Sequence, residues 1–309
     1  LRATPRAAVL DLLFRATPLL VLFGLYWVFS LASNLNIGHR HILPTYPVLY
    51  ILCGALGWLA AQAFTLSRRH GAIGVGLVAS LLAWHATVAA RIHPHHLAYF
   101  SPFAGGPTQG YKHLVDSSLD WGQDLPALKR WLSAHRQPGE RLYLSYFGSG
   151  EPDYYHLDAV RMATLPHFER LHPWHWCEPG LYAISATMLQ HVYLRQRGAW
   201  TPENERQYQE LRQNDANFRA LKANPHGHPE LFQGLTPVEW SKAWELYERL
   251  RFARLCHYLR ARKPDAYAGY SILIFRLTKA ELDAALEGSV TDLSLAIERA
   301  MSRANPSDR

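Results

Sequence analysis

The sequence predicts an all-α membrane region of three transmembrane helices, followed by a small extracytoplasmic α/β domain with a helical insertion. Two observations carry this fold class. No Asp or Glu occurs from Leu12 through Val115, and three long uncharged runs lie in this window. Strand-like and helix-like patterns then alternate through the rest of the 309 residues, which is typical of α/β domains.

The net charge of +7 lies almost wholly in the apolar third of the chain. Residues 1–92 hold seven Arg, no Lys and one acid, whereas residues 93–309 hold 25 basic and 24 acidic residues. A nucleic-acid-binding protein would carry its positive excess on a soluble domain. The distribution therefore argues against a nucleic-acid partner, and the 38 aromatic residues argue against disorder.

Spans are expected at about 16–38, 42–67 and 71–91, so that residues 1–92 form the transmembrane region. Each run reaches the roughly 20 apolar residues that cross a bilayer. Core helices of a soluble protein would show a charged face, and the interiors of these runs contain no charge. The lipid bilayer is therefore the first expected partner.

The distribution of Arg sets the expected orientation, because short cytoplasmic segments carry an excess of positive charge. Helix alternation places five Arg on one side of the membrane and two on the other. The larger set is Arg2, Arg6, Arg15, Arg68 and Arg69, and the smaller set is Arg40 and Arg91. The N-terminus is then cytoplasmic, and residues 93–309 lie outside, in the periplasm if the membrane is a bacterial inner membrane.

The outer part divides into a connector, a domain and a tail. Residues 93–110 are rich in Pro, Gly and aromatic side chains and are expected at the membrane interface. Residues 111–299 form the α/β domain, and residues 300–309 form a flexible tail. Within the domain, strands are expected at 141–147, 180–186 and 270–277, and helices at 124–134 and 187–197.

A charged helical insertion is expected at about 200–263, between the second and third of these strands. Thr236 and Glu239 form the pattern of a capping box there, and Thr278 and Glu281 form a second one after the third strand. Asp124 is expected to cap the helix at 124–134.

Two groups of polar residues suggest chemistry. The first is His39, Arg40 and His41, in the short outer loop before the second span. A guanidinium flanked by two imidazoles is suited to bind a phosphate or diphosphate, because Arg offers a planar fork of donors. The alternative is that Arg40 only extends toward lipid headgroups. The residues alone leave both open.

The second group is a turn in which Asp116, Asp120 and Asp124 lie beside Trp121 and Gln123. Such a turn is suited to hold a cation, to contact a sugar or to position a partner loop. The alternative is a capped helix start with Asx bonds. A structural or docking role is favoured for Asp120. Asp116, Asp120, Trp121 and Gln123 are therefore structural or acceptor-side candidates.

Histidine and cysteine give weaker patterns. Two clusters occur, but neither has a recognised zinc spacing, so we expect no metal site and no cofactor, and a divalent metal stays unsupported. Cys177 and Cys256 are able to pair if they lie together, which the sequence leaves open. The clusters are His93, His95 and His96, and His172, His175 and Cys177.

Two stretches together resemble a known family. Residues 36–47 (NIGHRHILPTYP) resemble the motif near the end of the membrane part of family 39-type glycosyltransferases. Residues 99–132 are similar to the segment just after the last span in bacterial members, which are relatives of protein O-mannosyltransferases and lipid A aminoarabinose transferases. The resemblance covers most of residues 20–190 and the strand near 270, but not the insertion.

The resemblance implies a multi-pass GT-C enzyme that takes a sugar from a polyprenyl-phosphate carrier. It implies that His39, Arg40 and His41 lie near the lipid phosphate. The family's catalytic carboxylate lies in the first outer loop, near the N-terminus of the full enzyme, and this chain has no acid between Leu12 and Val115. An acceptor hydroxyl needs a general base, so no catalytic residue is assigned in this chain.

The leading hypothesis is therefore the C-terminal portion of a membrane glycosyltransferase that uses a polyprenyl-phosphate-linked sugar. Its acceptor, on the outer face, is an unidentified glycan, lipid or protein. The alternative is a non-enzymatic, membrane-anchored α/β module that binds glycan or a catalytic partner subunit. A third hypothesis, a metal-dependent periplasmic hydrolase, requires zinc held by His172, His175 and Cys177.

Overall fold

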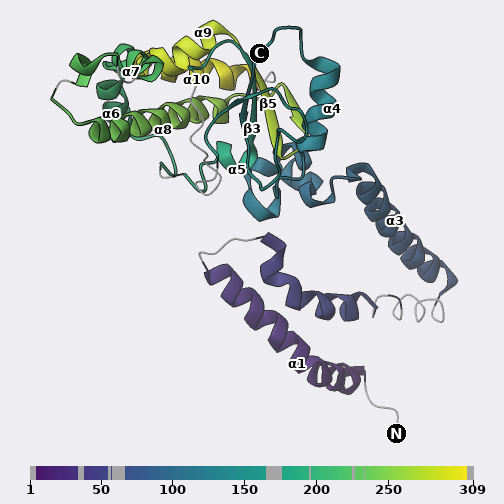
Figure 1. Cartoon of the computed structure of the whole chain (residues 1–309). Coiled ribbons are helices and arrows are strands. Elements are labelled where there is room, and N and C mark those ends of the chain that lie inside the picture. Colours follow the sequence, from purple (N-terminus) through teal and green to yellow (C-terminus); the bar gives the residue numbers. More distant parts are fainter. Residues whose placement is uncertain are drawn as a thin grey trace. The chain divides into compact units, whose positions relative to one another are not determined.

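The structure is a computed structural model, and Figure 1 shows the whole chain. It describes residues 5–33, 38–54, 57, 67–164, 176–194, 196–224, 227–232 and 234–304. The chain divides into two units, Leu1–His96 and Leu97–Arg309. Residues 97–110 of the expected connector therefore belong to the second unit.

The described part of the first unit is mainly helical. α1 (Pro5–Ala32) and α3 (Arg68–Ile92) are separated by the 3-10 helix η1 (Gly38–Thr45) and a helical segment at 46–54. Residues Phe14–Ala32 of α1 and the whole of α3 are long and apolar enough to cross a membrane. At about 1.5 Å per residue they measure roughly 28 and 37 Å, against a hydrocarbon core of about 30 Å.

These helices agree with the expected spans in part. The span expected at 16–38 lies in α1 but its helix ends at Ala32, and the span expected at 71–91 lies in α3. Of the span expected at 42–67, the described part is 3-10 helix followed by α-helix, and most of the remainder lies outside the described residues. Two helices of spanning length are present, and the third span stays a prediction.

The second unit is built on a five-stranded mixed sheet in the order β2-β1-β3-β5-β4. β1 (Leu142–Ser145) is parallel to β2 (Val160–Arg161) on one side and to β3 (Gly180–Ser185) on the other. β5 (Ile272–Leu277) is antiparallel to β3 and to β4 (Ala266–Ala268). All residues of β1 and β3 are buried, as in sheets covered on both faces.

Helices and short turns make up the rest of this unit. In chain order they are η2 (His96–Ala98), η3 (Pro102–Ala104), η4 (Pro107–Lys112), η5 (Asp116–Ser118), α4 (Leu125–His135), α5 (Ala186–Leu189), α6 (Pro202–Arg212), α7 (Asp215–Ala223), η7 (Pro229–Phe232), α8 (Pro237–Ala261), α9 (Lys279–Leu282), the π-helical η8 (Asp283–Glu287) and α10 (Val290–Ala304).

Helices α4 and α8 cover opposite faces of the sheet (Figure 1). Leu128 of α4 belongs to the same buried cluster as Ala183 of β3, whereas Leu255 of α8 belongs to the cluster of the neighbouring Tyr182. Successive strand residues point to opposite faces, which explains the two cores. The unit is therefore a three-layer α/β/α structure, in agreement with the small α/β domain expected.

The expected helical insertion is formed by α6, α7 and α8 and has an aromatic core of its own. Its buried residues are Tyr208, Phe218, Trp240, Tyr247 and Leu250. The two expected capping boxes are confirmed, with Thr236 at the start of α8 and Thr278 at the start of α9. Each box satisfies two backbone groups at a helix end.

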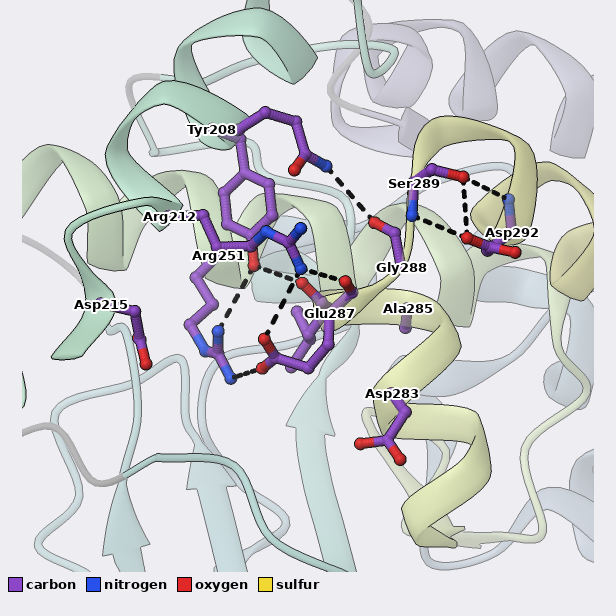
Figure 2. A network of polar contacts seen from close by, with 12 residues as sticks. Tyr208, Arg212, Asp215, Arg251, Asp283, Ala285, Glu287, Gly288, Ser289 and Asp292 are labelled. Carbon is purple, nitrogen blue, oxygen red and sulfur yellow. Dashed lines mark hydrogen bonds and ion pairs between the residues drawn. The ribbon is translucent and has the colours of Figure 1, made fainter.

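Charged side chains fasten the insertion to the segment after β5 (Figure 2). Arg251 of α8 donates to Oε1 of Glu287 at 2.7 Å, and the hydroxyl of Tyr208 in α6 donates to the carbonyl of Leu286 at 2.7 Å. Arg212 also donates to the carbonyl of Glu287. Two helices of the insertion thus contact η8 directly.

Arg254 makes a second, fully buried connection. Its guanidinium donates to both carboxylate oxygens of Glu205, at 2.9 and 3.0 Å. It also donates to the carbonyls of Ala285 at 2.6 Å, Gly288 at 3.0 Å and Ser289 at 3.2 Å. Burial alone would raise the pKa of Glu205, but the hydrogen bonds from Arg254 and its neighbours hold that pKa below its usual value.

The helix expected at 187–197 was wrong in length. It is only the short α5, which ends at Leu189 because His191 adopts a φ of 55°, outside the helical region. In the tail expected at 300–309, α10 continues through Ala304, and residues 305–309 lie outside the described residues. The strands β2 and β4 were not expected, since two or three residues are too few to show alternation.

We predict that Arg254→Met lowers the free energy of unfolding by about 3–5 kcal/mol, because it leaves the Glu205 carboxylate buried without its cation. Urea unfolding followed by tryptophan fluorescence measures this. The matched control is Arg206→Met, whose ion pair with Glu203 at 2.6 Å is exposed and contributes about 1 kcal/mol or less. Equal losses in the two variants would contradict a structural role for the buried pair.

Candidate functional site

The sheet offers one edge that is suited to bind a ligand. β2 and β3 lie on opposite sides of β1, and all three strands are parallel, so their carboxyl ends share an edge. In open α/β sheets, ligands bind outside the carboxyl ends where the strand order reverses in this way. The residues that follow β1 and β3 at this edge are 146–150 and 186–189.

The acidic turn 116–124 lies at this edge. The hydroxyl of Tyr146, directly after β1, donates to the carbonyl of Gly122 at 2.5 Å. The backbone N–H of Asp116 donates to Oγ1 of Thr187, directly after β3, at 2.9 Å. All four site residues predicted in the second unit (Asp116, Asp120, Trp121 and Gln123) thus lie within two positions of a bond to the sheet edge.

Asp120 is completely buried under this turn. Its Oδ1 accepts the backbone N–H of Gly122 at 2.9 Å, and its Oδ2 lies 3.5 Å from the Thr187 hydroxyl, which donates to it. Burial raises the pKa of Asp120 to about 7; the Gly122 hydrogen bond opposes this rise, and the charge of Asp124 adds to it. Its carboxyl therefore holds the turn and is closed to solvent.

Asp124 occupies the position before α4 but does not cap the helix with its carboxylate, so this expectation was wrong. Oδ2 instead accepts the hydroxyl of Ser271 at 2.7 Å and the backbone N–H of Ser271 at 3.3 Å. Pro126 is the second residue of α4 and has no N–H, which removes one donor that a cap would use. Asp124 therefore ties α4 to the start of β5.

Glycines allow these carboxylates to approach the backbone. Gly122 has a φ of 76°, and a Cβ there would lie 2.4 Å from the Tyr146 hydroxyl and 2.7 Å from Cα of Gly148. Gly269 has a φ of 63°, and a Cβ there would lie 1.9 Å from Oδ1 of Asp124. Both positions require glycine, for conformation and for space.

Asp116 is half-buried at the outer side of the turn, with a φ of 56°. Its Oδ2 accepts the hydroxyl of Tyr193 at 2.7 Å, and the Tyr193 ring stacks on Phe147 at 5.7 Å. Sequence reasoning missed Tyr193, since it lies in the stretch expected to be helical. The same reasoning missed Thr187 and Ser271, whose only signal is their position at strand ends.

Trp121 and Gln123 are exposed residues of the turn, and 62% of the Trp121 surface is accessible to solvent. The Trp121 indole N–H donates to the carbonyl of Ser117 at 3.1 Å, and its backbone N–H donates to Oε1 of Gln123 at 2.7 Å. An exposed aromatic ring held in this way is a preformed surface for stacking, with little conformational entropy left to lose. The arrangement is suited to recognition of a ring or an apolar group.

His39, Arg40 and His41 lie together in η1 of the first unit. Nδ1 of His39 is 3.0 Å from the hydroxyl of Tyr46, and the two rings meet edge to face. Arg40 is exposed. The structure therefore brings the three predicted phosphate-binding residues into a single helical turn.

The expected histidine clusters give no metal site in the part of the chain that is described. His93 and His96 approach to 3.2 Å, but no three His, Cys, Asp or Glu side chains converge among the described residues. His172 and His175 lie outside these residues. Cys177 and Cys256 are both free thiols.

Comparison with known proteins adds no relative. No protein-family model, no curated protein and no solved structure matches the chain.

We predict that Asp120→Asn removes a pH dependence of stability. In the unfolded chain Asp titrates near pH 4, and in the folded protein the pKa of Asp120 is about 7. Below pH 4 both states hold the proton. As the pH rises from 4 to 7 the unfolded state releases it first, so the free energy of unfolding falls by up to about 1.4 kcal/mol per pH unit.

Asn keeps the acceptor for Gly122 and does not titrate. Urea unfolding at several values between pH 5 and pH 7 measures the free energy of unfolding of the wild-type chain and of Asp120→Asn. As the pH rises, the wild-type value should fall relative to that of the variant. A difference that stays constant across this range would show that Asp120 is ionised in the folded protein.

Proposed function

We propose that the chain is the C-terminal portion of a membrane glycosyltransferase that transfers a sugar from a polyprenyl-phosphate carrier to an acceptor on the outer face. The similarity of residues 99–132 to the segment after the last span of family 39-type enzymes carries this proposal. Two features support it. The segment begins seven residues after α3, which is of spanning length, and its acidic turn lies at the carboxyl-end edge of an α/β sheet.

The donor requires a site for a phosphate at the membrane surface. Arg40 supports this role because a guanidinium binds a phosphate through two parallel hydrogen bonds, and His39 and His41 flank it. The acceptor requires a general base for its hydroxyl. Asp120 and Asp124 are buried and hydrogen-bonded, Asp120 to Gly122 and Asp124 to Ser271, so under this proposal the base comes from elsewhere in the enzyme.

A second candidate function is a membrane-anchored module that binds glycan or a catalytic partner subunit. The exposed and fixed ring of Trp121 favours it, since a sugar ring or a partner loop can stack there without any reaction. The two functions differ in whether a sugar is transferred by the protein that contains this chain.

We predict that Arg40→Ala in the full-length protein lowers kcat/KM for the polyprenyl-phosphate sugar about ten- to a hundredfold, the loss expected for a charge-assisted hydrogen-bonded contact. Arg40→Lys should recover only part of this, because the fork geometry is lost. Transfer of a radiolabelled sugar from the carrier in membranes measures both. Unchanged carrier dependence, with equal expression, would exclude phosphate binding by Arg40.

Trp121→Ala is predicted to raise KM for the acceptor by up to about tenfold, which corresponds to the stacking energy of one aromatic ring. Trp121→Phe should retain most of the affinity. The matched control is Val238→Ala, an exposed apolar residue at the start of α8. If Trp121→Ala changes glycan binding in a protein that transfers no sugar, the binding module is the correct function.

A further inference from the structure

The first segment of the second unit combines buried and exposed apolar residues in a regular pattern. Ala98 is buried, and Phe100 packs against the core, where its ring leaves no space for a Cβ at Gly110. Leu97 and Tyr99 alternate with them and are 40% and 44% exposed. One side of this segment therefore holds it to the unit, and the other presents apolar surface.

Phe103 stands at the tip of the same segment and is 98% exposed. The turn that carries it is well bonded: Oγ of Ser101 accepts the N–H of Phe103 at 3.3 Å, and the carbonyl of Ser101 accepts the N–H of Ala104 at 2.8 Å. His113 contacts the carbonyl of Ala104 at 3.1 Å. Burial of a Phe side chain away from water is favourable, and the Phe103 side chain makes no such burial within the described part of this chain.

Chain connectivity limits where this surface can lie. Leu97 comes five residues after Ile92, the last residue of α3, so the two lie within about 18 Å of each other even if the link is fully extended. If α3 spans a bilayer, Leu97 lies close to the headgroup layer at its end. Aromatic residues favour that layer.

The charge of the segment suits the same location. The acid-free stretch from Leu12 to Val115 contains the whole of it, and Lys112 is exposed close by in sequence. Anionic headgroups would meet no negative side chain here, and lysine near an anionic surface adds attraction.

We propose that Leu97–Ala104 is a membrane-interface anchor, in which Phe103 inserts below the headgroups and Leu97 and Tyr99 lie among them. The anchor fixes how the α/β unit stands on the bilayer. This inference rests on α3 crossing the membrane, as the proposed function requires.

Nitroxide labels at single cysteines test the anchor in the full chain, reconstituted in vesicles of phosphatidylethanolamine and phosphatidylglycerol. The background carries Cys53→Ser and Cys177→Ser, and Cys256 is buried. Labels replace Phe103, Leu82 in α3, and Tyr154, a 77% exposed aromatic residue of the second unit. The measurement is the collision rate of each label with oxygen, which enters lipid, and with a water-soluble nickel chelate.

We expect the label at Phe103 to favour oxygen over the nickel chelate several-fold more than the label at Tyr154 does. The label at Leu82 should favour oxygen most. If Phe103 matches Tyr154 while Leu82 is in lipid, the anchor is wrong and the membrane span stands. If Leu82 itself meets the nickel chelate freely, the span and the proposed function both fail. A Phe103 label that is closed to both reagents would indicate a protein contact and overturn the anchor.

A second pair of variants guards against an effect of the label itself. With the label moved to Tyr99, Phe103→Asp should increase collisions with the nickel chelate, because a charge inserts poorly into lipid, whereas Phe103→Leu should leave them unchanged. Equal values in both variants would contradict insertion of residue 103.

Discussion

The arrangement of the second unit depends on two carboxylates that are buried, away from water, at the edge of the sheet. A buried carboxyl group is costly unless hydrogen bonds replace its hydration. Gly122 and Thr187 donate hydrogen bonds to Asp120, and Ser271 donates two to Asp124. These bonds tie one turn to the segment after β3 and to the start of β5, and the Tyr146 hydroxyl ties it to the end of β1. The turn that buries these carboxylates leaves the Trp121 side chain facing solvent on a hydrogen-bonded backbone.

Sequence patterns correctly predicted features that depend on residues close together in the chain. The capping box at Thr236 uses a partner three residues away, and it was predicted correctly. Asp124 looked like a cap by the same reasoning, but Ser271, 147 residues further along the chain, takes its carboxylate. The two helices of spanning length were predictable because long uncharged apolar runs are visible in the sequence itself. The sheet-edge contact of Tyr193 depends on the fold, and no local pattern signals it.

The helical insertion also shows that local sequence patterns do not predict long-range contacts. Its many charges predict a solvated surface, yet Arg251 and Arg254 are buried and hold α8 against η8. Arg254 is surrounded in sequence by charged and apolar residues alike, and its burial follows only from the position of Glu205 on α6. A buried guanidinium needs several acceptors in fixed places. The insertion is therefore bound rigidly to the α/β core.

These features divide the tasks of the proposed enzyme between its parts. An acid that removes a proton from an acceptor must reach it, and Asp120 is enclosed while Asp124 is engaged by Ser271. Exposed side chains of the turn, with Trp121 foremost, are able to contact an acceptor without reacting with it. Arg40, in the other unit, suits the phosphate of the donor. The chain then supplies binding groups for both substrates, and the base must lie in a part of the enzyme that these residues do not include.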